Sequence, residues 1–221
     1  MDSLYVKRLV IFDLDGTLLN TIADLGQACN HALARAGYPC HPLESYPMMV
    51  GNGITRLIER ALPAGHRDQA TIDLARRYFL DFYGLHCMEL TRPYPGIGEL
   101  LSALTSRGIM VAVASNKYQE AVTALISHYF PEIPWTAVEG QRDTRPTKPS
   151  PDIVFDIMAI TGVKPADVLY VGDSGVDIDT ARNAGVDCAG VTWGFRPESE
   201  LREHGAVHLV HEASMLLDMI E

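Results

Sequence analysis

Short apolar runs and stretches with helical spacing follow one another along most of the chain. Leu9 to Phe12 and Val168 to Val171 are continuous apolar runs of the kind that form strands buried on both faces of a sheet. We predict strands at 9–12, 109–114, 136–139, 168–171, 188–191 and 207–210, and helices at 97–104, 118–128, 152–161, 176–184, 198–204 and 213–220. This alternation predicts an α/β fold, a doubly wound (Rossmann-like) parallel sheet with helices on both faces.

Residues 20–91 follow a different pattern. Their apolar positions have helical spacing in three segments, 22–36, 54–62 and 68–85. No strand pattern interrupts these segments, and the Pro and Gly residues of 91–96 mark a return linker. We therefore expect an all-helical cap domain at 20–91, inserted into an α/β core formed by residues 1–19 and 92–221.

Composition limits the classes of function. With 221 residues, 47% of them hydrophobic, the chain is expected to fold as an ordinary globular protein. A net charge of −10 argues against nucleic-acid binding, and no apolar stretch is long enough to span a membrane. The first eight residues show no secretory signal, so we expect a cytoplasmic protein. The cysteines lack CxxC spacing, which predicts reduced thiols rather than a zinc site: Cys29, Cys40, Cys87 and Cys188.

The first predicted strand ends in two carboxylates, Asp13 and Asp15, followed by Gly16 and Thr17. Strand geometry places the two carboxylates on the same side, and ligands of open α/β sheets bind outside the carboxyl ends of the strands. Gly16 allows a ligand to approach the backbone, and the amides from Thr17 onward can cradle an anion. The alternative is a structural cap in which acidic residues only close a strand-to-turn connection.

Polar residues also follow three later strands and are expected at the same edge of the sheet: Ser115, Asn116, Lys148, Asp173 and Asp177. Two carboxylates about 4 Å apart repel by about 4 kcal/mol at an effective dielectric constant near 20. A cation must therefore lie among three or four of them. Because the candidate ligands are oxygens, with no His or Cys in these segments, Mg²⁺ is favoured over Zn²⁺.

A magnesium site of this kind implies a phosphate ester as the second ligand. Ser115 and Asn116 can hydrogen-bond phosphoryl oxygens, and Lys148 supplies a positive charge against the transferring group. One aspartate can attack phosphorus to form an aspartyl-phosphate, and the other can transfer protons.

These segments resemble, in order, the four signature motifs of the haloacid dehalogenase-like hydrolase superfamily. The matching stretches are residues 13–17, the strand end at Ser115, residues 148–151 and residues 172–185. The resemblance implies that Asp13 is the nucleophile and a Mg²⁺ ligand, and that Asp15 is the acid/base, whose backbone carbonyl also binds the metal. It further implies that Ser115 and Lys148 hold the phosphoryl group, that Asp173 binds Mg²⁺ and that Asp177 supports the metal shell.

An Asp at position 15 resembles the phosphatase and phosphomutase members of the superfamily. The cap segment 51–62 is similar to that of phosphoglycolate phosphatases. In it, the turn around Asn52 can offer N–H groups to a substrate carboxylate, and Arg56 can add a charge. The alternative is that this turn is only a tight connection between helices.

The leading hypothesis is a Mg²⁺-dependent phosphomonoester hydrolase that acts on a small phosphorylated metabolite, with 2-phosphoglycolate as the best single substrate. Sugar-phosphate or nucleotide phosphatases, pyrophosphatases and phosphomutases are alternatives within the superfamily. A non-catalytic phospho-acceptor or ligand-binding module is the alternative from another class, but such a module needs neither a cap nor Asp15. The sequence leaves open whether the protein is a monomer or a homodimer.

Overall fold

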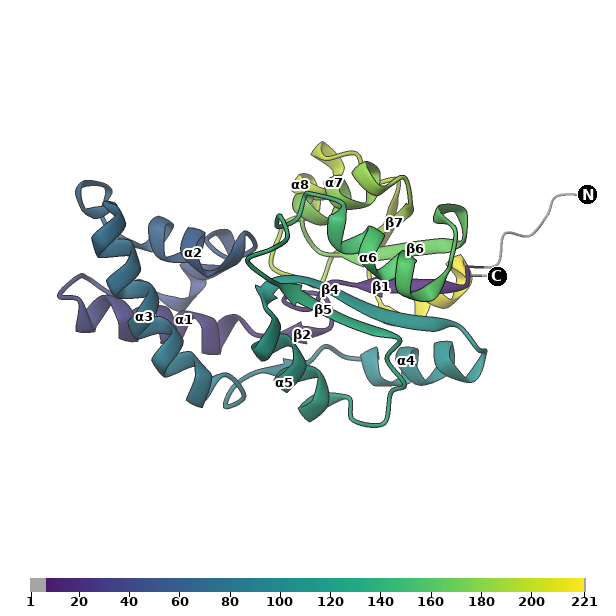
Figure 1. Cartoon of the computed structure of the whole chain (residues 1–221), viewed down its shortest axis with the longest axis horizontal. Coiled ribbons are helices and arrows are strands. Elements are labelled where there is room, and N and C mark those ends of the chain that lie inside the picture. The colour runs from purple at the N-terminus through teal and green to yellow at the C-terminus, as the bar shows by residue number, and fades with distance from the viewer. Residues whose placement is uncertain (1–6, 221) are drawn as a thin grey trace, which may run out of the picture.

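The computed structural model describes residues 7–220 and contains a six-stranded parallel sheet in the order β5-β4-β1-β6-β7-β8 (Figure 1). The strands are β1 (Leu9–Phe12), β4 (Met110–Tyr118), β5 (Ala137–Gln141), β6 (Val168–Gly172), β7 (Asp187–Val191) and β8 (His208–Val210). The helices of the core are α4 (Ile97–Ser106), α5 (Gln119–Tyr129), α6 (Asp152–Thr161), α7 (Gly175–Ala184) and α8 (Glu198–Glu203). The predicted doubly wound α/β fold is confirmed.

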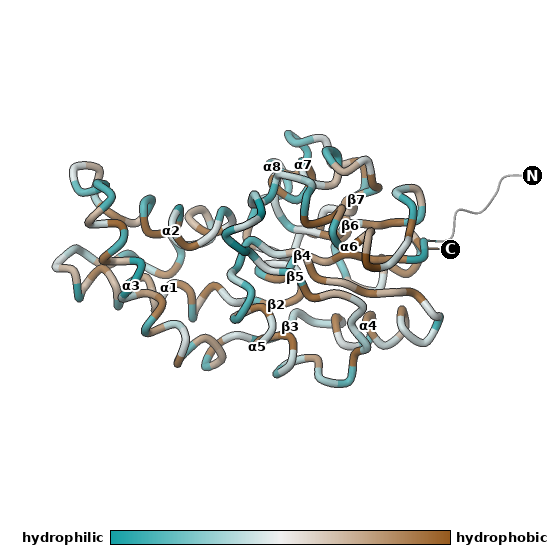
Figure 2. Tube along the Cα trace, in the orientation of Figure 1, coloured by the Kyte–Doolittle hydropathy of each residue, from teal (hydrophilic) through white to brown (hydrophobic). Residues whose placement is uncertain are grey.

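Helices cover both faces of the sheet, and the alternation of side chains along β1 shows how. Val10 and Phe12 are fully buried in a cluster with residues of α4 and α5. Leu9 and Ile11 point to the opposite face and are buried with residues of α6 and α7. Figure 2 shows hydrophobic colouring along the strands of the six-stranded sheet. The apolar run predicted as a strand is therefore buried on both sides.

Three helices form a separate layer at one end of the molecule: α1 (Ile22–Arg35), α2 (Gly53–Ala61) and α3 (Gln69–His86) (Figure 1). They pack around their own apolar cluster, which includes Cys29, Leu33, Leu57 and Phe79. These helices lie within the expected cap at residues 20–91, whose bounds as a domain stay a prediction.

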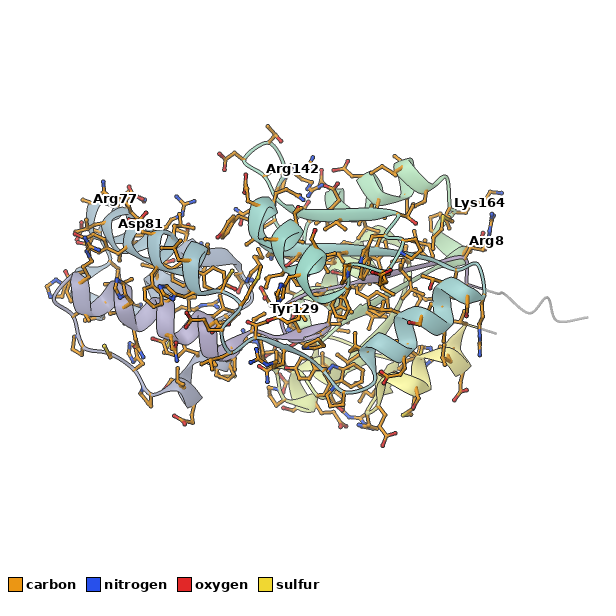
Figure 3. All side chains as sticks on the ribbon, turned by 90° about the horizontal axis from the view of Figure 1, so that it is seen from below. Arg8, Arg77, Asp81, Tyr129, Arg142 and Lys164 are labelled. Carbon is orange, nitrogen blue, oxygen red and sulfur yellow. The ribbon has the colours of Figure 1, made fainter. Side chains whose placement is uncertain are left out.

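Two linkers join the cap to the core and lie side by side. Short strand β2 (Leu19–Asn20) pairs antiparallel with β3 (Arg92–Pro93). The buried Asp24 carboxylate accepts hydrogen bonds from the Thr91 amide (2.8 Å) and hydroxyl (2.7 Å). Tyr129, labelled in Figure 3, donates from α5 to the Thr91 carbonyl (2.8 Å). Both ends of the insertion are therefore fixed at one point of the core.

The structure adds details that the pattern did not predict. The strand expected at 109–114 continues to Tyr118, and the proline-rich connection in the cap contains a 3₁₀ helix at Leu43–Met48. Further 3₁₀ turns lie at Ala64–His66, Pro165–Asp167 and Ala213–Met219, the last where a short helix was expected. No helix among residues 7–220 is long and apolar enough to cross a membrane. Most of the N-terminal segment inspected for a signal sequence lies outside the described residues.

Candidate active site

The carboxyl ends of the three central strands meet because β1 lies between β4 and β6. Asp13 follows β1, Ser115 lies in the last part of β4, and Asp173 follows β6. All three side chains line one cavity, which extends to the cap residues Val50 and Leu57. The cavity is small: its volume is about 50 Å³, and by the same measure one water molecule needs roughly 10–15 Å³.

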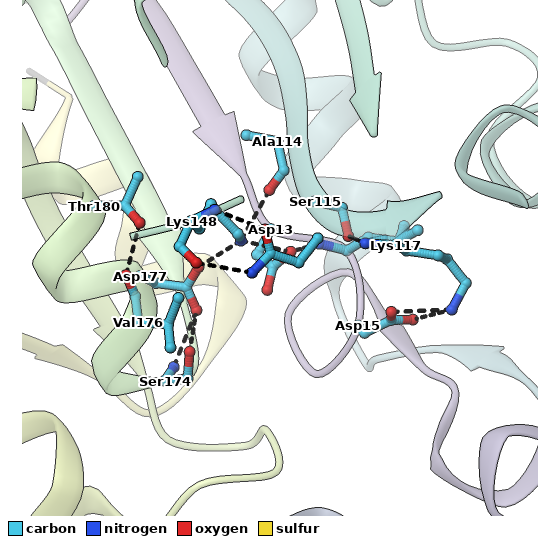
Figure 4. Close-up of polar contacts among 12 residues, drawn as sticks. Asp13, Asp15, Ala114, Ser115, Lys117, Lys148, Ser174, Val176, Asp177 and Thr180 are labelled. Atoms are coloured by element: carbon cyan, nitrogen blue, oxygen red, sulfur yellow. Dashed lines mark hydrogen bonds and ion pairs between the residues drawn. The ribbon is translucent and has the colours of Figure 1, made fainter. Parts of the chain in front are cut away.

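Three buried carboxylates form the acidic centre of this site. Oxygen atoms of Asp13, Asp173 and Asp177 all lie within 4.8 Å of one another. The Lys148 ammonium lies 3.0 Å from Asp13 Oδ1 and 2.7 Å from Asp177 Oδ1 (Figure 4). Lys148 also donates to the Tyr170 hydroxyl (3.0 Å), and only 2% of its side chain is exposed. The predicted acidic cluster and its lysine are thus brought together.

The acidic centre carries more negative than positive charge. Three carboxylates face one ammonium, so full ionisation leaves two negative charges in a buried volume. Burial raises the pKa of Asp13 to about 7. Attraction to Lys148 lowers this pKa, but repulsion from Asp177 and Asp15 adds to the effect of burial, and the net shift is upward. Burial and the same kind of repulsion also raise the pKa of Asp173. Burial alone would lower the pKa of Lys148, but Asp13 and Asp177 outweigh it and raise that pKa.

A divalent cation fits this imbalance in both charge and donor chemistry. Carboxylate oxygens are the ligands that Mg²⁺ prefers, and one such ion would neutralise the excess charge. The backbone approaches Asp173 closely, since a Cβ atom at Gly16 would lie 2.3 Å from Asp173 Oδ2 and one at Gly194 would lie 2.4 Å from it. The Phe195 amide donates to the same oxygen (2.7 Å). Asp173 is therefore held at a fixed position on the cavity wall.

Asp177 has a different environment from the other two carboxylates. It is the third residue of α7, and its Oδ2 accepts hydrogen bonds from the Ser174 hydroxyl (2.6 Å) and amide (3.2 Å) in a capping box. Its Oδ1 accepts from Lys148. Since both oxygens have protein partners, Asp177 holds the Lys148 ammonium in place, and its predicted support of the metal shell stays a prediction.

The Asp15 carboxylate lies apart from the acidic centre. Lys117 donates to both of its oxygens at 3.0 Å, and Thr21 donates to Oδ1 at 2.7 Å. The Lys117 ammonium also lies 4.8 Å from the ring centre of Tyr83 in the cap. Lys117 is a site residue that the sequence reasoning missed. Lys117 follows Ser115 by two residues, as Asp15 follows Asp13. This spacing after neighbouring strands could have indicated that Lys117 lies next to Asp15.

The other predicted core residues occupy distinct places. Ser115 lines the cavity, and its hydroxyl accepts from the Lys117 amide (3.2 Å). The Asn116 carboxamide accepts from the Lys148 amide (2.8 Å) and donates to the Lys148 carbonyl (3.2 Å). Thr17 is fully buried, and its carbonyl accepts from the Trp193 indole N–H (3.1 Å). Substrate contacts of Gly16, Thr17, Ser115 and Asn116 stay predictions.

The two predicted cap residues do not reach the cavity. Arg56 is exposed on the outside of α2 and pairs with Glu59 in the same helix (2.5 Å). Asn52 accepts from Arg60 (2.6 Å). The cavity wall contains neither of them, but it does contain Arg196, from the loop after β7, which the sequence reasoning did not single out.

Comparisons with known proteins place this geometry in a family. The sequence profile of the haloacid dehalogenase-like hydrolases matches residues 10–191. The chain is 38% identical over 200 residues to a Pseudomonas putida phosphoglycolate phosphatase, covering 86% of this chain and 71% of that one. It is 34% identical to a Thiobacillus denitrificans phosphoglycolate phosphatase, with 95% of each chain covered.

Solved structures agree with the sequence relatives. The fold matches a Lactobacillus delbrueckii protein provisionally assigned as a phosphoglycolate phosphatase, with a TM-score of 0.92, 31% identity, and coverage of 97% of this chain and 98% of the other. The resemblance inferred from the ordered motifs is confirmed. The chain belongs to the haloacid dehalogenase-like hydrolase family.

Proposed function

We propose that this phosphatase is Mg²⁺-dependent and hydrolyses a small phosphate monoester through an aspartyl-phosphate at Asp13, with 2-phosphoglycolate as the substrate. One observation supports it above all: Asp13 is buried between Lys148 and two further carboxylates, at the wall of a cavity that is also lined by cap residues. The names of the relatives at 30–38% identity support the choice of substrate.

Asp13 is oriented for attack by its own neighbours. Its Oδ1 accepts from the Leu14 amide (2.7 Å) and pairs with Lys148, which leaves Oδ2 as the attacking oxygen. The new Asp13–phosphorus bond forms as the bond from phosphorus to the leaving oxygen breaks. A Mg²⁺ ion held by Asp13, Asp173 and the Asp15 carbonyl would neutralise the charge of the phosphoryl oxygens. Lys148 adds a fixed positive charge, and Ser115 hydrogen-bonds the same group.

Asp15 transfers the protons in both halves of the reaction. As a carboxylic acid it protonates the leaving alkoxide, and as a carboxylate it then takes a proton from the water that attacks phosphorus. The second attack breaks the Asp13–phosphorus bond and releases inorganic phosphate. Lys117 and Thr21 hold Asp15 beside the cavity between these steps.

The cap limits the size of the substrate. Leu25, Val50, Ile54 and Leu57 form an apolar roof over the acidic centre, and the volume below it is small. A two-carbon phosphate ester suits this volume better than a nucleotide or a hexose phosphate does. The roof also excludes bulk water while the aspartyl-phosphate exists.

The experiment is a panel of phosphate esters assayed for phosphate release, with kcat/KM compared across 2-phosphoglycolate, sugar phosphates, nucleotides and pyrophosphate. We expect turnover that requires Mg²⁺, disappears with a chelator and is highest for 2-phosphoglycolate. Asp13→Asn is the matched inactive control. Metal-independent turnover, or full activity of that variant, would refute the proposal. A requirement for a bisphosphate primer would indicate a phosphomutase instead. The cytoplasmic location and the monomeric or homodimeric state stay predictions.

A further inference from the structure

The loop after β7 connects the acidic centre to the cap. The Trp193 indole binds the Thr17 carbonyl, Gly194 lies against Asp173, and the Phe195 amide donates to the Asp173 carboxylate. The next residue is Arg196. Because the loop is fixed at three consecutive positions, the backbone of Arg196 is held beside the acidic centre.

The Arg196 side chain reaches from that point to the cap. Its Nη2 donates to the Val50 carbonyl at 2.7 Å, and only 10% of the side chain is exposed. Its Nε lies 3.6 Å from Glu200 Oε1, which is longer than a hydrogen bond, and the same oxygen accepts from the Gly175 amide (3.1 Å). Arg196 is thus a cavity-lining guanidinium with only a loosely associated carboxylate.

The cap end of the cavity carries one guanidinium in its wall, that of Arg196. Arg60 is exposed outside the cavity and donates to the Met49 carbonyl (2.7 Å), so this backbone segment of the cap lies between Arg60 and Arg196. The cavity therefore has an acidic end that suits a cation and a phosphate, and a guanidinium at its cap end that suits a second anion.

We propose that Arg196 binds the carboxylate of the substrate and makes the enzyme specific for phosphate esters of small hydroxy acids. This inference rests on the proposed phosphatase function and names the class of substrate. A guanidinium binds a carboxylate through two parallel hydrogen bonds, for which Arg196 exchanges its weak contacts with Glu200 and with the Met48 sulfur (3.3 Å).

The competing role for Arg196 is a purely structural contact, a latch that joins the core to the cap. Two matched substrates distinguish this latch from carboxylate binding. The first is 2-phosphoglycolate, and the second is ethyl phosphate, which has the same two carbons and phosphate but no carboxylate. The variants are Arg196→Gln, Arg196→Lys and the control Arg202→Gln, which removes an exposed guanidinium paired with Glu198 on α8 (2.7 Å). Thermal unfolding of each variant checks its folding.

We expect Arg196→Gln to raise KM for 2-phosphoglycolate by about 10- to 100-fold, with kcat/KM for ethyl phosphate within about threefold of wild type. Arg196→Lys, which keeps the charge and is the second variant to assay if the glutamine variant fails to fold, should recover part of the loss. Arg202→Gln should change neither substrate. Equal losses of kcat/KM for both substrates would show a latch and overturn the inference. Unchanged kcat/KM for both substrates would also overturn it. A wild type that hydrolyses neither substrate refutes the proposed function itself, and this inference with it.

Discussion

Replacing Asp13 by Asn should abolish activity and yet stabilise the metal-free protein at alkaline pH. Loss of the nucleophile is expected to lower kcat by at least about 1,000-fold. The stability effect follows from charge: the acidic centre places Asp13, Asp173 and Asp177 opposite Lys148 alone. Removing one carboxylate charge reduces repulsion, while an Asn oxygen can still accept the hydrogen bond from the Leu14 amide.

The magnitude comes from the pKa of Asp13. Its ordinary value of 3.8 in the unfolded chain rises to about 7 in the folded protein, so ionisation costs about 4 kcal/mol more when folded. Because the folded state binds the proton more tightly, the free energy of unfolding falls as pH rises from about 4 to about 7. Above pH 7 the full cost is present, and Asp13→Asn removes up to that amount. In thermal unfolding this corresponds to a rise in Tm of roughly 8–15 °C.

The assay is unfolding of wild type and Asp13→Asn at pH 5 and pH 8, each with a chelator and with excess Mg²⁺. With the chelator, we expect the variant to be more stable at pH 8 and the difference to shrink at pH 5. Mg²⁺ at about 100 times its Kd should stabilise wild type by about 3 kcal/mol and the variant by less. A variant that is less stable than wild type at pH 8 without metal would refute the charge balance derived for this site.

Three further changes test other parts of the site. Lys148→Met should lower the free energy of unfolding by about 3–5 kcal/mol, because the substitution leaves buried carboxylates without their cation. Chemical denaturation measures this free energy, and a loss below about 1 kcal/mol would contradict the prediction. Lys117→Met should lower kcat by about 10- to 100-fold and leave KM within about threefold of wild type, since Asp15 loses its two hydrogen bonds from the Lys117 ammonium. Steady-state kinetics that show a change in KM alone would count against a role of Lys117 in positioning Asp15. Gly194→Ala should weaken Mg²⁺ binding by about 10- to 100-fold in calorimetry, because its Cβ would overlap Asp173, and unchanged affinity would exclude Asp173 as a metal ligand.

The fold was predictable because each element carries a local signal. Buried parallel strands such as Leu9–Phe12 are continuous apolar runs, and helices such as Asp152–Thr161 have their own periodicity and end at a glycine in the left-handed region, Gly162 (φ 68°). The extension of β4 to Tyr118 was not predictable in this way. It depends on pairing with Gln141 after an irregular register, which is a long-range contact between polar residues.

The acidic centre was predictable from strand ends, whereas the cap end of the cavity was not. Asp13 and Asp173 follow neighbouring parallel strands, so topology alone brings them together. Arg56 was chosen for its closeness in sequence to a glycine-rich turn, although the buried stripe of α2, which includes Leu57 and Ala61, already places it on the outer face. Arg196 reaches the cavity only through tertiary contacts of its loop.

The proposed mechanism requires that Asp13 becomes phosphorylated during turnover with Mg²⁺. The most direct measurement mixes 2-phosphoglycolate with excess enzyme, quenches the reaction in acid within milliseconds, and maps the digested protein by mass spectrometry. We expect one added phosphoryl group on the peptide that contains Asp13, dependent on Mg²⁺ and absent from Asp13→Asn. Release of phosphate with no labelled Asp13 at any quench time, or a label on another residue, would contradict it.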